Sequence, residues 1–83
     1  MTPTDDGYGL GFGEFENLLA ALTRTSARWL AEALGLSVRR TAGRWVFADA
    51  EGAGVPAHAM WERSQAARAT RREVYGIWMA IFR

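Results

Sequence analysis

Residues 14–34, EFENLLAALTRTSARWLAEAL, repeat apolar side chains at the period of an α-helix, and this repeat narrows the folds open to the chain. At about 100° per residue, the apolar side chains gather on one side of such a helix and most of the charged ones on the other. Gly35 follows where helices commonly end. The sequence therefore predicts one amphipathic helix over 14–34, whose apolar side consists of Phe15, Leu18, Leu19, Leu22, Trp29, Leu30 and Ala33.

The length of the chain limits it to one core. It has 83 residues, 49% of them hydrophobic, which is enough for one compact domain and too few for two. We expect residues 14–83 to form that single domain and residues 1–13 to be a flexible arm rich in glycine and aromatic residues.

The composition also excludes several classes of site and location. No cysteine is present, so the sequence excludes disulfides, thiolate metal sites and cysteine nucleophiles, and a reducing compartment suits the chain. The acidic start lacks the features of a signal peptide, and the longest apolar run, 74–82, is too short to span a bilayer. The sequence predicts a soluble, cytoplasmic protein that has no membrane partner.

Two further elements follow Gly35. Residues 36–49, LSVRRTAGRWVFAD, predict a β-hairpin in which Gly43 supplies the positive φ of a bulged turn.

Residues 56–82 predict a second helix, interrupted only by Gly76 and with an apolar stripe along one side. A continuous helix would be about 40 Å long, whereas a compact chain of this size is roughly 30 Å across. We therefore expect it either to bend at Gly76 or to extend beyond the domain. The stripe consists of Met60, Ala67, Val74, Trp78 and Ile81.

These elements predict a small α+β domain in the order helix, hairpin, long helix (αββα), with both helices on one face of the hairpin. In element order alone, the chain resembles double-stranded RNA-binding domains. It lacks their third strand and the lysine-rich start of their last helix, so their function is not carried over.

The glycine-rich stretch GYGLGFGEF, residues 7–15, has the composition of a phosphate-binding loop but not its context. Such a loop follows a strand inside a βαβ unit, whereas only six residues precede the first glycine here, and nearby carboxylates would repel phosphate. We therefore expect no nucleotide cofactor. In an extended conformation Tyr8, Leu10 and Phe12 would share one face. This ribbon would add an edge strand to the hairpin, bind a groove on another protein, or remain a frayed terminus.

Catalytic and metal-binding patterns are sparse. His58 is the only histidine, and none of the serines lies in an activating motif. His58 and Glu62 stand four residues apart, but two ligands do not make a zinc site, and a paired or solvated histidine is the favoured interpretation. The carboxylates all lie in segments that read as exposed. The sequence predicts a protein that is not an enzyme and has no metal or cofactor.

Arginine and aromatic residues alternate on one side of the second helix, at Trp61, Arg68, Arg72, Tyr75 and Met79. This combination is typical of nucleic-acid surfaces and of protein-interface hot spots; alternatively, arginine stems cover apolar neighbours on a solvated face. With the hairpin arginines added, the predicted partner-binding residues are Arg39, Arg40, Arg44, Trp61, Arg68, Arg72 and Tyr75. The predicted apolar interface consists of Tyr8, Leu10, Phe12, Ile77, Met79 and Phe82.

The charges of the chain bear on the partner. The net charge is +1, which is low for a dedicated nucleic-acid binder. The charges are nevertheless uneven, because residues 1–34 hold two arginines and five carboxylates, whereas residues 35–83 hold eight arginines and four carboxylates. Such polarity would steer an anionic partner to one side of the molecule.

Two functional hypotheses follow from these patterns. The first is a non-enzymatic interaction protein, or inhibitor, that occupies a surface of a larger protein or nucleoprotein complex. In its size, lack of cysteine and lack of catalytic motifs the chain resembles phage-encoded inhibitors, anti-CRISPR proteins included, although no motif carries this class-level analogy. The alternative is a small DNA- or RNA-binding regulator that forms a homodimer through residues 74–82.

Overall fold

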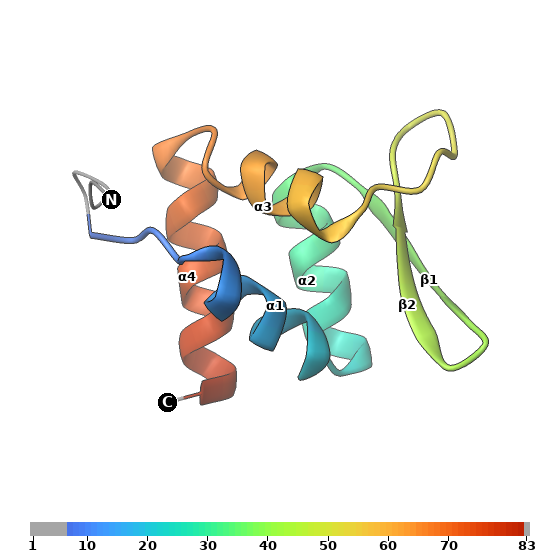
Figure 1. Ribbon diagram of the computed structural model, residues 1–83, viewed down its shortest axis with the longest axis horizontal. Coiled ribbons are helices and arrows are strands. Elements are labelled where there is room, and N and C mark those ends of the chain that lie inside the picture. Colours follow the sequence, from blue (N-terminus) through green and yellow to red (C-terminus); the bar gives the residue numbers. More distant parts are fainter. Residues whose placement is uncertain (1–6, 83) are drawn as a thin grey trace.

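The computed structural model describes residues 7–82 of the chain, and within them four helices flank a two-stranded antiparallel hairpin (Figure 1). This arrangement confirms the predicted small α+β domain of helices and a hairpin. The elements are α1 (Phe12–Ala20), α2 (Arg24–Leu34), β1 (Ser37–Thr41), β2 (Arg44–Ala48), α3 (Ala57–Ser64) and α4 (Arg68–Phe82).

The predicted single helix over 14–34 is wrong, because the chain turns at residues 21–23 and forms α1 and α2 instead. Thr23 is the N-cap of α2: its Oγ1 accepts a hydrogen bond from the backbone N–H of Ser26 at 3.2 Å. In return, Oγ of Ser26 accepts one from the backbone N–H of Thr23 at 2.8 Å. This reciprocal cap provides hydrogen-bond acceptors for backbone N–H groups that have no partner within the helix at its start. A new helix therefore begins here, although the apolar period continues.

The second predicted helix is also divided, but not at Gly76, which lies inside α4. The break falls at residues 65–67, where the hydroxyl of Ser64 donates to the backbone carbonyl of Trp61 at 2.6 Å. Nη1 of Arg71 donates to the backbone carbonyl of Gln65 at 2.9 Å and so satisfies an acceptor that the end of α3 leaves open. The chain therefore turns at residues 65–67, and neither expected alternative, a bend at Gly76 or an extension beyond the domain, occurs.

The hairpin forms where the sequence predicts it, with Ser37 opposite Ala48 and Thr41 opposite Arg44. Its two-residue turn has positive φ at Ala42 (51°) and at Gly43 (76°), as type I′ turns do, rather than a bulge. The two predicted helices do not cover one face of it. In Figure 1, α2 lies between α4 and the hairpin, which stand at opposite ends of the molecule; α2 packs against both β1 and α4.

The core is built mainly by helices. Phe15, Leu18 and Leu30 are completely buried, and Phe47 is the buried side chain that the hairpin adds. Trp29 was expected on the buried side of its helix, but 50% of it is exposed. The remaining core residues are Leu10, Ala27, Ala31, Leu34, Met60, Val74 and Ile77.

The described part of the glycine-rich arm packs against the helices rather than along the hairpin. Leu10 is 5% exposed, and its backbone carbonyl accepts a hydrogen bond from Nε1 of Trp61 at 2.9 Å. The ring of Tyr8 lies 5.6 Å from that of Tyr75, and the ring of Phe12 lies 5.7 Å from that of Trp61. Residues 7–11 therefore add no strand to the sheet, and residues 1–6 of the expected arm lie outside the described residues.

Within residues 7–82, none of the helices combines the length and the apolar character that crossing a membrane requires.

Candidate binding groove

The structure divides the predicted arginine and aromatic surface into separate parts. Arg68, Arg72, Tyr75 and Met79 follow one another at helical spacing along α4. Trp61 belongs to α3 and turns toward the start of α1. The hairpin arginines lie at the end of the molecule opposite α4 (Figure 1). The hairpin and α4 therefore offer two basic regions rather than one continuous patch.

The predicted apolar interface is likewise divided. Leu10 and Ile77 are core residues, with 5% and 8% of each exposed, so a partner cannot reach their side chains in this conformation. Phe82 is 44% exposed, and Met79 is half-buried. Tyr8, Tyr75, Trp78 and Phe82 instead form a row of ring contacts along α4, with centroids 5.6, 6.0 and 5.4 Å apart.

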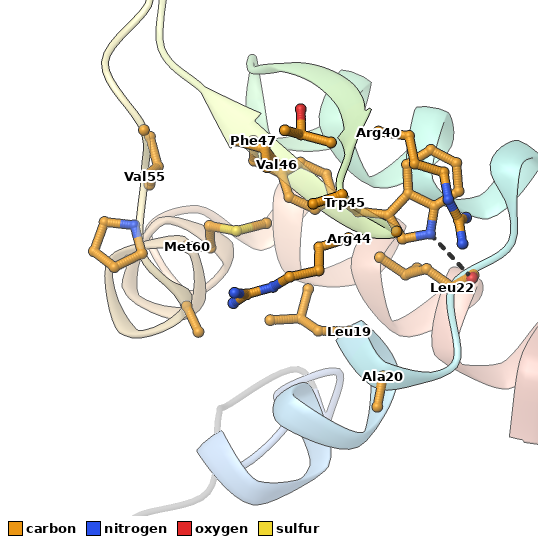
Figure 2. A pocket seen from close by; sticks show the side chains of 16 residues that line it. Leu19, Ala20, Leu22, Arg40, Arg44, Trp45, Val46, Phe47, Val55 and Met60 are labelled. Atoms are coloured by element: carbon orange, nitrogen blue, oxygen red, sulfur yellow. Dashed lines mark hydrogen bonds between the residues drawn. The ribbon is translucent and has the colours of Figure 1, made fainter.

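A groove of about 910 Å³ separates the hairpin from the end of α1 and the start of α3 (Figure 2). Its apolar walls include Leu19 of α1, Phe47 of β2, Met60 of α3 and Val55 from the segment that leads into α3. Leu19 was expected to lie in the core, but it is only half-buried because the chain turns shortly after it. The groove combines residues from positions 19 to 60, so no local motif could have revealed it.

Two arginines stand beside these apolar walls. Arg40 lies opposite Trp45 in the hairpin register, and its Cζ is 4.7 Å from the centroid of the indole ring, a cation–π contact. The side chain of Arg44 extends from the start of β2 toward Leu19 in Figure 2. Both arginines are exposed, and the residues that line the groove include no aspartate or glutamate. The groove is therefore electropositive as well as apolar.

Trp45 anchors the wall of the groove on the hairpin side. Its Nε1 donates a hydrogen bond to the backbone carbonyl of Leu22 at 3.3 Å, the dashed line in Figure 2, which ties β2 to the turn after α1. Val55 donates its backbone N–H to the carbonyl of Phe47 at 2.8 Å, which ties the segment before α3 to the same strand. These bonds hold the walls in place without a ligand.

The third hairpin arginine does not belong to the groove. Arg39 is exposed and is not among the residues that line the groove, although Val46, opposite it in the register, is. Of the predicted partner-binding residues, the structure thus brings only Arg40 and Arg44 to the groove.

His58 lies on α3, outside the groove. Its Nδ1 is 3.8 Å from a carboxylate oxygen of Glu62, and both side chains are mostly exposed. The rings of Phe12 and Trp61 lie 5.1 and 5.5 Å from the imidazole. Residues 7–82 contain no group of three histidine or acidic side chains placed to hold a metal ion.

Comparison of this chain with protein-family models, curated proteins and solved structures found no match. Its function is therefore inferred from the geometry and charge of the groove.

Proposed function

We propose that this protein is a non-enzymatic interaction protein whose groove binds a segment of a larger protein, one that presents an apolar side chain next to a carboxylate. The observation that carries the proposal is the joining of apolar walls with Arg40 and Arg44 in a groove lined by no acidic residue. The apolar walls favour a hydrophobic side chain, and the arginines select a neighbouring negative charge.

The two contributions differ in size. Full burial of a leucine or phenylalanine side chain contributes about 1.5–3 kcal/mol. An ion pair at an exposed arginine contributes only about 0.2–1 kcal/mol. The apolar contact therefore supplies most of the affinity, and Arg40 and Arg44 mainly determine which segments bind and how fast they associate.

In this proposal the protein acts by covering a surface that another macromolecule needs. Inhibitors of the phage-encoded class work in this way, and the chain resembles them in size and composition. The target would be a cytoplasmic protein or a nucleoprotein complex, and the groove would bind an acidic and apolar segment on its protein component.

A displayed library of random 12-residue peptides tests the proposal. Selection on the wild-type protein should enrich sequences in which aspartate or glutamate adjoins a large apolar residue. A synthetic peptide from this class should bind Arg40→Glu/Arg44→Glu at least about tenfold more weakly, which reflects two lost attractions and two new repulsions. The matched control is Arg24→Glu/Arg28→Glu, which makes the same change in net charge on exposed positions of α2 away from the groove.

Three results would contradict the proposal. The first is a selected class without acidic residues, and the second is a class whose affinity changes equally in both double variants. The third is a salt-dependent gel shift of DNA or RNA that Arg68→Glu/Arg72→Glu abolishes and the groove variant retains. That result would favour the alternative function, a dimeric nucleic-acid-binding regulator that uses the exposed face of α4.

A further inference from the structure

A second depression, of about 360 Å³, lies between α2 and α4 and shares no residue with the groove. Three residues of α2 and three of α4 line it: Trp29, Glu32, Ala33, Glu73, Gly76 and Ile77. We call it the α2–α4 hollow.

Two of its residues have no role that the fold explains. Trp29 is 50% exposed, an unusual position for the largest apolar side chain in a chain with a single small core. Gly76 lies inside α4, where glycine is less favourable than alanine. Its φ is not positive, and a Cβ built there would meet no atom within 4 Å, so neither backbone conformation nor packing requires a glycine. The missing side chain keeps the hollow open.

The charge of the hollow is negative. Glu32 and Glu73 are exposed, and neither forms an ion pair within residues 7–82. The lining contains no basic residue. Glu32 follows Trp29 by three positions on α2, so the carboxylate and the indole ring are neighbours on the helix surface. An indole face next to two unpaired carboxylates attracts a cation.

We propose that the α2–α4 hollow binds an arginine side chain presented by a partner protein. A guanidinium group stacks flat on an indole ring and at the same time donates hydrogen bonds to carboxylates from its edge, which a compact ammonium cannot do equally well. The aliphatic stem of the arginine would occupy the space above Gly76 and Ile77. This site is independent of the groove and has the opposite charge preference, so one molecule would contact an acidic segment and a basic segment at different surfaces.

The test uses random 12-residue peptides displayed on phage and selected on the wild-type protein. We expect a class with arginine at a fixed position that is lost when selection is repeated on Trp29→Ala or on Glu32→Gln/Glu73→Gln. The matched control is Glu16→Gln/Glu51→Gln, which removes two exposed carboxylates elsewhere and should retain the class. In a synthetic member, arginine to alanine should weaken binding about tenfold or more, and arginine to lysine about threefold or more.

A spectroscopic measurement locates the site. Titration with the arginine peptide should shift the indole N–H resonance of Trp29, assigned through Trp29→Phe, while the resonance of Trp45 in the groove stays in place. The proposal is overturned if selection yields no arginine class, if the class survives both hollow variants, or if Trp45 shifts instead of Trp29. It is also overturned if mass in solution grows with concentration and Glu32→Gln/Glu73→Gln abolishes the growth, because the hollow would then be filled by a second copy of this chain.

Discussion

The helical part and the hairpin of this protein differ in how completely the fold uses their side chains. The helices bury Phe15, Leu18 and Leu30 completely. In contrast, β1 has one half-buried residue, Val38, among exposed ones, and Phe47 is the buried side chain of β2. Stability is therefore concentrated in the helices, and the hairpin is attached at a few points that leave its groove side open to a partner.

The same contrast applies to hydrogen bonds made by tryptophan. Trp61 joins α3 to the backbone of the buried Leu10 at 2.9 Å, whereas Trp45 joins the hairpin to Leu22 at 3.3 Å. The bond of Trp61 fixes the glycine-rich segment to the helices, and the longer bond of Trp45 positions the hairpin wall of the groove. Five experiments on substituted proteins test the helices and the hairpin, from the largest expected effect to the smallest.

The largest effect is expected for Phe15→Ala. Removing a completely buried ring leaves a cavity and should lower the free energy of unfolding by about 3–5 kcal/mol. Val38→Ala in the hairpin removes a half-buried side chain and should cost less than about 1.5 kcal/mol. Urea unfolding followed by circular dichroism measures both. Equal losses would show that the hairpin contributes as much stability as the helices.

Trp61→Phe should lower the free energy of unfolding by about 1–3 kcal/mol, because the carbonyl of Leu10 loses its donor close to the core. Trp45→Phe breaks a longer bond, to the half-buried Leu22, and should cost less. It should, however, weaken binding of the acidic peptide, which Trp61→Phe leaves unchanged. Thermal unfolding and peptide titration of the two variants separate these roles, and the reverse pattern would refute the division.

Thr23→Ala should cost about 1 kcal/mol, because it removes the side chain that caps α2. The control is Thr25→Ala, at an exposed position two residues later in the same helix. Helix content from circular dichroism should stay close to that of wild type in both. A gain in helix content in Thr23→Ala would indicate that α1 and α2 have merged into the single helix that the apolar period alone predicts.

Gly76→Ala should raise the free energy of unfolding by about 0.5–1 kcal/mol, because alanine is the better residue in a helix interior and its methyl group meets no neighbour. The same methyl group partly fills the α2–α4 hollow, so affinity for the arginine peptide should fall while affinity for the acidic peptide stays constant. A gain in stability without loss of affinity for the arginine peptide would show that Gly76 does not contribute to the binding site.

The smallest effect is expected for Ala42→Gly at the tip of the hairpin. Ala42 has a positive φ of 51°, a conformation that glycine adopts more easily. Because glycine also has more freedom in the unfolded chain, the net gain should be at most about 0.5 kcal/mol. The midpoint of thermal unfolding measures it. A clear loss would show that the turn is not under strain.

Both helix breaks have local causes that apolar periodicity conceals. The pattern Thr23 to Ser26 is a capping signal, but it lies inside an apolar repeat that continues without a change of phase, so the repeat is the stronger signal in the sequence. The break at residues 65–67 has no glycine or proline to mark it. Nη1 of Arg71 donates to the carbonyl of Gln65, six residues earlier, and no sequence motif marks this contact.

The sequence by itself determined the features whose causes lie within a few residues: the hairpin with Gly43 in its turn, the presence of helices before and after it, and the α+β class. The tertiary structure decided which charged side chains lie next to which apolar ones. Arg40 and Arg44 came to a groove with Leu19 and Met60, whereas Arg68 and Arg72 lie on α4 at the other end of the molecule. The helical and strand periods show which residues are neighbours on one element. The distance between two elements depends instead on where helices break and how the core packs. No short stretch of sequence contains that information.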